Sequence, residues 1–206
     1  NEILKLKKKY KIKIIEDCAQ AHGAEFEKKK VSTFGEIGTF SFFPSKNLGC
    51  FGDGGCLVTN NKKLYLKMKK ISNHGGLKKN SHLILGRNSR LDNLQAGILR
   101  IKLRNLDRWI ALRNKQAELY YKHLKGIKKI SFVKQLKNTK SSFHLMVIKS
   151  QYRDNLKKYL NSKGIQTGIH YPKSLPETNI FKKKHFKYCK SMNSVKFSKK
   201  ILSLPI

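Results

Sequence analysis

The sequence predicts an α/β protein with a second, smaller α+β domain at its C-terminal end. Short apolar strands in the first 73 residues end in polar or glycine-rich turns, which is typical of open α/β sheets. A long helical periodicity follows, and then a shorter series of strand, helix and strand. We therefore place the large domain at residues 1–125 and the small domain at residues 126–206.

The first predicted strand, Lys11–Asp17, ends in carboxylates and is expected to be buried and parallel to its neighbour. Gln20 follows three positions after Asp17, among small residues. Because ligands in open α/β sheets bind beyond the carboxyl ends of strands, Asp17 and Gln20 lie where a cofactor is expected. A buried carboxylate there would need a cationic partner, such as a protonated heteroaromatic nitrogen. The alternative role for Asp17 is a helix N-cap.

The second predicted strand is the aromatic segment Gly38–Phe43, which breaks at Pro44. Its alternation puts Ser41 on the face opposite the two phenylalanines that flank it. Lys46 follows in a tight loop before a glycine-rich turn. Desolvation lowers the pKa of a lysine amine and makes it a nucleophile towards carbonyls, as a Schiff-base enzyme requires. The alternative is that Lys46 is one of many solvated lysines.

The third strand is predicted at Gly55–Thr59, after a tight turn at Phe51–Gly55. The glycines of this turn could cradle a phosphate, but no helix start follows them, so a plain turn is favoured. Asn60 or Asn61 is then expected to cap a helix that runs to about Ser72.

Apolar residues at helical spacing predict one long amphipathic helix from Ser89 to Leu124, with Trp109 in the core and Gly126 as the C-cap. The core-facing positions are Leu91, Leu94, Ile98, Leu99, Ile101, Leu103, Leu106 and Ile110. The small domain is predicted to contain a strand at Phe143–Ile148, a helix at Tyr152–Lys163 that Gly164 ends, and a strand at Gly164–His170.

Four segments, in this order and spacing, resemble the DegT/StrS group of pyridoxal-phosphate sugar aminotransferases, which have the aspartate-aminotransferase fold (fold type I). They are IIEDCAQAHGA, GTFSFFPSKNLGCFGDGGCLVTNN, NHGG and LGRNSRLDNLQAGILRIKLRNLDRW, and the closing ILSLP is similar too. The resemblance implies a large domain with a mixed, mostly parallel sheet, a long helix that bridges the domains, and a truncated small domain. It also implies a longer whole subunit, because relatives carry an N-terminal portion with further cofactor contacts.

The resemblance implies a role for each candidate residue. Lys46 would form a Schiff base with pyridoxal 5′-phosphate and move the proton between substrate and cofactor. Asp17 would pair with the pyridinium nitrogen and Gln20 with the ring hydroxyl. Ser41 would donate to the phosphate. Asn88 would reach the phosphate of the neighbouring subunit's cofactor, which implies a homodimer with shared active sites.

His170 and Tyr171 resemble the family segment that lines the substrate entrance. An edge-strand histidine and a packed tyrosine are the alternative interpretation. The implied reaction transfers an amino group, with glutamate as the expected donor, to a keto sugar carried by a nucleotide. Some relatives carry histidine in place of the lysine and catalyse dehydration, so Lys46 favours transamination.

The chain has 46 Lys and Arg against 12 Asp and Glu, a formal charge of +34. Such a balance typically indicates nucleic acid, anionic membrane or acidic substrates. The lysines, however, come in scattered runs without the interleaved aromatics of a nucleic-acid platform. We therefore expect no specific nucleic acid, and a basic surface that attracts a nucleotide-linked sugar. A catalytically inactive relative and a basic anion- or nucleic-acid-binding protein remain as alternatives.

No segment approaches a membrane span, and the start of the chain lacks the apolar region of a secretory signal. The cysteines Cys18, Cys50, Cys56 and Cys189 form no C-x-x-C pair. We therefore expect reduced thiols, no metal site, no membrane association and a cytoplasmic protein.

Overall fold

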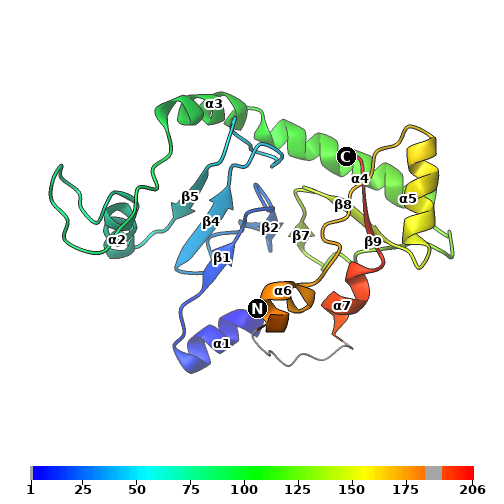
Figure 1. Ribbon diagram of the computed structural model, residues 1–206, viewed down its shortest axis with the longest axis horizontal. Helices are drawn as coiled ribbons and strands as arrows, with labels where there is room; N and C mark the ends of the chain where they lie inside the picture. The colour runs from blue at the N-terminus through cyan, green and yellow to red at the C-terminus, as the bar shows by residue number, and fades with distance from the viewer. Residues whose placement is uncertain (1, 184–191) are drawn as a thin grey trace. The chain divides into compact units, whose positions relative to one another are not determined.

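The computed structural model describes residues 2–183 and 192–206, and the chain forms two compact units (Figure 1). The first unit comprises Asn1–Leu112 and Lys137–His144, and the second comprises Arg113–Leu136 and Leu145–Ile206. The domain division at residue 125 stays a prediction, because these units describe only packing within the chain.

In the first unit, the helix after the third strand confirms the prediction. The side chain of Asn61 caps it by accepting a hydrogen bond from the Leu64 amide at 3.1 Å. A helix at the start of the chain was not predicted. The elements are α1 (Glu2–Tyr10), β1 (Ile15–Asp17), β2 (Glu25–Phe26), β3 (Lys29–Lys30), β4 (Ile37–Ser41), β5 (Gly55–Val58), α2 (Lys62–Ser72), α3 (Asn93–Leu103), the start of α4 (Leu106–Leu124) and β7 (Thr139–Lys140).

The sheet that carries the candidate residues has the strand order β1-β4-β5. Strand β1 is parallel to β4, as predicted, with Asp17 opposite Thr39, and β5 is antiparallel to β4. The predicted burial of the first strand is wrong, because Ile15 is 65% exposed. Among the described residues, β1 is an edge strand, so no neighbouring strand covers its outer side.

Glu16, in the middle of β1, is a structural hydrogen-bond acceptor. Its carboxylate accepts bonds from the backbone amides of Ser32 at 2.8 Å, Phe34 at 2.8 Å and Gly35 at 2.6 Å. These bonds hold the loop that precedes β4 against β1. Because side chains alternate along a strand, Asp17 points to the other side, where it is exposed.

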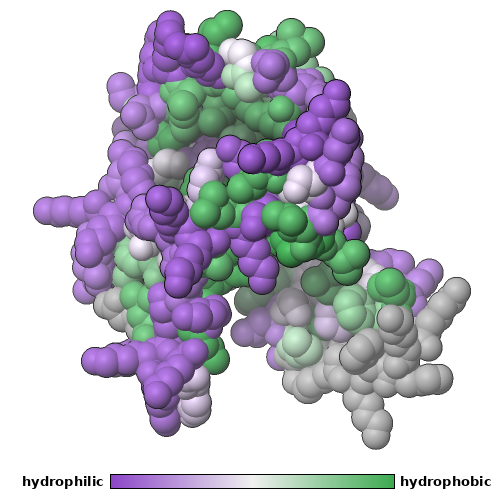
Figure 2. Space-filling model, turned by 90° about the vertical axis from the view of Figure 1, so that its left-hand side faces the viewer, coloured by the Kyte–Doolittle hydropathy of each residue, from purple (hydrophilic) through white to green (hydrophobic). Residues whose placement is uncertain are grey.

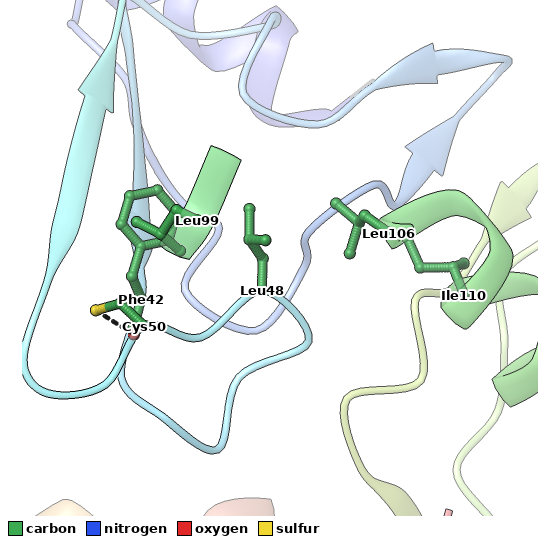
Figure 3. Packing of buried hydrophobic residues seen from close by; sticks show 6 residues of the cluster. All are labelled: Phe42, Leu48, Cys50, Leu99, Leu106 and Ile110. Atoms are coloured by element: carbon green, nitrogen blue, oxygen red, sulfur yellow. Dashed lines mark hydrogen bonds between the residues drawn. The ribbon is translucent and has the colours of Figure 1, made fainter. Parts of the chain in front are cut away.

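The core of the first unit lies where β4 and the loop after it meet α3 and the start of α4 (Figure 3). The Cys50 thiol also donates to the carbonyl of Phe42 at 3.1 Å. Burying this apolar surface is the main source of stability for the unit. The buried residues of this core are Phe42, Leu48, Cys50, Leu99, Leu106 and Ile110.

The predicted single helix from Ser89 to Leu124 is wrong in two respects. The helical segment begins only at Asn93, and it is interrupted between α3 and α4. At the break, the amide of Asn105 donates to the carbonyl of Lys102 at 3.0 Å, in a tighter turn than an α-helix makes. Asn105 directly precedes α4, a position that asparagine favours.

Only some of the residues predicted to face the core along this helical segment are buried. Leu99, Leu106 and Ile110 are buried, whereas Leu94 is 77% and Ile101 67% exposed. Helical periodicity shows that a face is apolar, but what covers that face depends on tertiary packing. In the same region Trp109, predicted in the core, is only half-buried, and Leu103 is exposed.

The second unit is built on the antiparallel sheet β6-β8-β9. Met146, Ile148 and Leu202 are its most deeply buried side chains. Its elements are the remainder of α4, β6 (Ser131–Phe132), β8 (Met146–Lys149), α5 (Arg153–Ser162), a 3-10 helix (Leu175–Glu177), α6 (Asn179–Lys183), α7 (Asn193–Ser198) and β9 (Ile201–Leu204).

The helix predicted before Gly164 is confirmed as α5, and Gly164 has a φ of +74°, as expected after a helix C-terminus. The strand predicted from Phe143 begins only at Met146, because Phe143 adopts a left-handed φ of +41°. The strand predicted at Gly164–His170 is wrong. Only Gly168 pairs there, in an isolated bridge with Ser203 of β9.

Cys18, Cys50 and Cys56 are free thiols, and Cys189 lies outside the described residues. Within residues 2–183 and 192–206, no group of three or more His, Cys, Asp or Glu side chains could hold a metal ion. In the same part of the chain, no helix has the length and apolar character needed to cross a bilayer.

Candidate active site

Lys46 lies in a loop that folds tightly back onto the end of β4. Its backbone amide donates to the carbonyl of Phe43 at 2.9 Å, and the amide of Cys50 returns to the carbonyl of Phe42 at 2.8 Å. Gly49 has no room for a side chain, since a Cβ there would meet the Phe43 carbonyl oxygen. Residues 47–50 are all buried, and Lys46 itself is half-buried. The loop therefore holds the lysine firmly while leaving it accessible.

Asp17 lies at the carboxyl end of β1, directly beside β4. Because the two strands are parallel, Asp17 and the Lys46 loop follow the same end of neighbouring strands, where ligands bind in such sheets. The Asp17 carboxylate accepts a hydrogen bond from the Ala19 amide at 3.0 Å, and turns follow instead of a helix. The alternative role of Asp17 as a helix N-cap is therefore wrong. Gln20 lies in this turn region and is exposed.

Ser41 is the last residue of β4 and lies opposite Gly55 of β5. It is half-buried, and its Oγ accepts a hydrogen bond from the Phe43 amide at 3.3 Å. A hydroxyl with this orientation still has its own proton to donate. Asp17 and Ser41 are thus the last residues of two adjacent strands, and Lys46 follows in the loop after β4.

His22 is a buried polar residue beside these groups that the sequence analysis missed. It is 3% exposed, and its ring centroid lies 5.3 Å from that of Phe40 and 6.1 Å from that of Phe42. Burial lowers its pKa, a hydrogen bond with the Ser41 backbone opposes this shift, and the positive charge of Lys46 adds to it. Its Nε2 has no hydrogen-bond partner within the described chain. The imidazole is therefore neutral at pH 7.

Cys18, just after β1, is not a nucleophile in this environment. Burial and then the negative charges of Glu16 and Asp17 raise the pKa of its thiol to about 11. Because the thiolate is the reactive form, Cys18 stays inert at neutral pH. Cys18 is also buried, whereas Lys46 is only half-buried and can be reached by a ligand.

Asn88 lies in an exposed segment that follows α2. Its Oδ1 accepts a hydrogen bond from Arg90 Nε at 3.2 Å, and Arg90 also donates to Asn73 Oδ1 at 3.3 Å. No hydrogen bond in the described part of the chain joins Asn88 to Lys46 or Asp17. The structure thus leaves Asn88 facing solvent.

His170 and Tyr171 belong to the second unit. The His170 Nδ1 is 2.9 Å from Ser203 Oγ. The rings of His170 and Tyr171 meet edge to face, with their centroids 5.8 Å apart. Tyr171 is 62% exposed, so the alternative of a packed tyrosine is wrong. Both side chains could reach a ligand from solvent.

A hollow of about 830 Å³ lies in the first unit between β5, α2 and the segment before α3. Figure 2, which views the molecule from the side of α2, shows hydrophobic surface among hydrophilic side chains. None of the predicted site residues lines the hollow, although Arg90, which hydrogen-bonds Asn88, does. Its apolar lining comes from Phe40, Cys56, Leu57, Tyr65, Met68 and Leu91.

An amine, a carboxylate and a hydroxyl at the ends of adjacent strands fit a small phosphorylated aldehyde with a basic ring nitrogen. The amine can condense with the aldehyde, the carboxylate can keep a ring nitrogen protonated, and the hydroxyl can donate to a phosphate. The α/β fold is the fold type I architecture of the sugar aminotransferases that the chain resembles in structure.

The whole chain, residues 1–206, matches the DegT/DnrJ/EryC1/StrS aminotransferase family, and it belongs to that family. One similar protein is the dTDP-3-amino-3,4,6-trideoxy-alpha-D-glucose transaminase of Streptomyces venezuelae, which is 37% identical over 193 residues. That alignment covers 94% of this chain and 51% of the relative. A UDP-N-acetyl-3-dehydro-alpha-D-glucosamine 3-aminotransferase of Acidithiobacillus ferrooxidans is also 37% identical, over 99% of this chain and 54% of its own length.

Solved structures agree with this assignment. The fold is similar to that of DesV from Streptomyces venezuelae in complex with a ketimine intermediate, with a TM-score of 0.94 and 35% identity. The match covers 99% of this chain and 55% of DesV. NtdA of Bacillus subtilis, solved with its bound cofactor PMP, has a TM-score of 0.85 at 28% identity, over 98% of this chain and 48% of NtdA. The chain thus spans about half the length of the relatives it matches.

Proposed function

We propose that this chain forms part of a pyridoxal-phosphate-dependent aminotransferase. The enzyme would move an amino group, from glutamate as the expected donor, to a keto group of a nucleotide-linked sugar. The observation that carries the proposal is that Asp17 ends β1 and Lys46 lies in the loop just after β4, the adjacent parallel strand. The names of the related dTDP-sugar and UDP-sugar transaminases support the substrate class.

Pyridoxal 5′-phosphate, when bound, supplies a reactive aldehyde and a ring that accepts electrons. The amine of Lys46 would hold the cofactor through its aldehyde carbon and would later carry the proton at the substrate carbon. Asp17 would keep the ring nitrogen protonated through charge pairing. Gln20 would bind the ring hydroxyl and Ser41 the phosphate. A neutral His22 beside Ser41 adds no positive charge next to the Lys46 amine.

The remaining assignments belong to the same proposal. Asn88, which is exposed, would bind the cofactor phosphate of a second subunit, so the working enzyme would be a two-fold homodimer with shared sites. His170 and Tyr171 would face the sugar substrate. The enzyme would act in the cytoplasm, without a nucleic-acid or membrane partner.

A borohydride experiment tests the proposal. The protein is incubated with pyridoxal phosphate, reduced, digested and mapped by mass spectrometry. Lys46 should carry the pyridoxyl group at far higher occupancy than the exposed Lys63 of α2, which serves as internal control. The Lys46→Ala variant should lose the absorbance band of the bound cofactor, and Lys63→Ala should keep it. Equal labelling of Lys46 and Lys63 would reject the proposal.

A second candidate is a relative of this fold that does not catalyse transamination. One observation favours it: a "pleiotropic regulatory protein" of Geobacillus stearothermophilus is 38% identical over 206 residues, 99% of this chain and 55% of that protein. Such a protein would show no selective labelling of Lys46. If the protein instead bound DNA with a steep dependence on salt, unchanged by Lys46→Ala, a basic nucleic-acid binder would be the better assignment.

A further inference from the structure

We propose that Asn47 and Ser142 are positioning residues that clamp the Lys46 loop to the turn carrying Gln20. The inference rests on the proposed function, because it assigns these residues to the alignment of Lys46 and Gln20. Neither belongs to the groups expected to touch the cofactor. Both lie in the first unit, although 95 residues separate them in the sequence.

Asn47 follows Lys46 directly and is only 6% exposed. Its Nδ2 donates to the backbone carbonyl of Ser142 at 2.7 Å. Its Oδ1 lies 3.3 Å from the Nδ1 of His144. Both ends of the buried amide are thus hydrogen-bonded to one short segment, which fixes the direction of the Lys46 loop.

Ser142 is 2% exposed and extends the connection. Its Oγ donates to the backbone carbonyl of Gln20 at 3.4 Å. A continuous path of hydrogen bonds therefore leads from Asn47 through Ser142 to Gln20. It joins the two loops that follow β4 and β1, and both loops carry residues assigned to the cofactor.

The clamp depends on an unusual backbone conformation at Phe143. Its φ of +41° lies in the left-handed region, which a bulky side chain rarely adopts. The turn at this residue lets the carbonyl of Ser142 and the ring of His144 both meet Asn47. Such a conformation persists only where its surroundings enforce it, and it is common near functional sites.

Asn47 and Ser142 offer only a neutral amide and a hydroxyl, so they would act through the residues they hold. Small displacements of a reacting group are costly, because a shift of about 1 Å can reduce a rate by about 100-fold. A clamp between the amine and the ring-binding turn would prevent such a shift.

The first test needs no cofactor and uses hydrogen–deuterium exchange on the full chain. Ser142→Ala removes the bond to Gln20 but leaves the carbonyl that Asn47 uses. We expect amide exchange over residues 18–24 to accelerate about fivefold, as the loss of one buried hydrogen bond allows. Asn47→Ala should accelerate exchange over residues 44–50 as well. Exchange at the wild-type rate in both variants would overturn the proposal.

The second test measures alignment through the ratio of pyridoxyl labelling at Lys46 to labelling at Lys63. Ser142→Ala and Asn47→Ala should lower this ratio about tenfold. The matched control is Ser150→Ala in the second unit, which removes another buried serine, one that accepts a hydrogen bond from the Tyr152 amide. The control should keep the wild-type ratio, whereas equal losses in all three variants would show a purely structural role.

The two tests separate this inference from the proposed function. If wild-type Lys46 is not labelled selectively, the cofactor assignment fails, and the exchange data still show whether the clamp exists. If Asn47→Ala does not fold, Ser142→Ala alone decides, since it removes only one hydroxyl.

Discussion

Two loops are built in opposite ways: the Lys46 loop, proposed to hold the cofactor of its own subunit, and the Asn88 segment, proposed to reach the cofactor of a second subunit. The Lys46 loop is packed into its own unit, with Asn47 and Leu48 each only 6% exposed. The segment that carries Asn88 is exposed over residues 82–90, and its Leu85 is 97% exposed. Only the first loop contributes to the core of the unit (Figure 3).

The difference shows which parts of the proposed site this chain can shape by itself. The Lys46 loop is held by the buried side chain of Leu48, the close packing at Gly49 and the hydrogen-bonded amide of Asn47. The Asn88 segment is tied to the end of α2 by the Arg87 and Ser89 amides, which donate at 2.8 and 2.9 Å. Those bonds fix its backbone and leave its side chains to meet something outside the unit, as the proposed dimer requires.

The largest expected effect compares one leucine from each loop. Leu48→Ala should lower the free energy of unfolding by about 3 kcal/mol, because it leaves a cavity in the core. Leu85→Ala should change it by less than about 0.5 kcal/mol, because its side chain is solvated. Urea denaturation of both variants measures the difference. Similar losses would show that the Asn88 segment is packed in solution.

Next in size is a pair of glycines within the Lys46 loop and the turn after it. A Cβ at Gly49 would collide with backbone carbonyl oxygens, so Gly49→Ala should cost about 2 kcal/mol. A Cβ at Gly52 would meet only the end of the Gln95 side chain at 3.3 Å, so Gly52→Ala should be nearly neutral. If Gly49→Ala unfolds at the wild-type urea concentration, the loop has room for a Cβ at this position and is not packed against the carbonyl oxygens of Phe43 and Pro44.

Asn88→Ala tests the exposed loop through cofactor affinity instead of stability. Its stability should stay within about 0.5 kcal/mol of the wild type, because the side chain is exposed and makes only one exposed hydrogen bond, with Arg90. Its affinity for pyridoxal phosphate should fall about tenfold if the amide binds a phosphate across a dimer. Fluorescence titration measures the affinity, and sedimentation reports the oligomeric state. Unchanged affinity in a confirmed dimer would remove Asn88 from the site.

The smallest effect is confined to acidic pH and concerns His22, next to the buried loop. Burial lowers its pKa below the ordinary 6.5, so the unfolded chain binds the proton more tightly than the folded chain. The contribution of His22 to the free energy of unfolding is therefore constant above about pH 6.5. The protein becomes less stable as the pH drops below that value. His22→Phe should flatten the profile there. Denaturation midpoints at pH 7.5 and 5.5 measure the change, and an unchanged slope would contradict the assignment.

Local patterns were sufficient to predict several elements and candidate positions. The asparagine cap of α2 and the glycine after α5 lie where the sequence places them, and the aromatic strand predicted at Gly38–Phe43 is found as β4, Ile37–Ser41. The same holds for the positions of Asp17 and Lys46 after adjacent strands. In each case the signal is carried by a few neighbouring residues, so it is independent of distant packing.

Features that depend on distant residues were not predicted. The apolar periodicity continues past Asn105, so it does not report the helix break there. The strand predicted before His170 does not form, because only Gly168 pairs with β9. Asn47 and His22 stand beside motif residues, but nothing local shows that they are buried. The partnership of Asn47 with Ser142 spans 95 residues, and no local pattern reports it.

The two adjacent carboxylates of β1 have opposite environments, and this makes the strand intolerant of changes in length. A slip of one residue against β4 would exchange them, because a strand alternates its faces. Glu16 would then turn outward and leave the amides of residues 32, 34 and 35 without their acceptor. Asp17 would turn inward and leave the open end of the sheet without its acid. Insertions or deletions within β1 should thus be far more harmful than substitutions at the same positions.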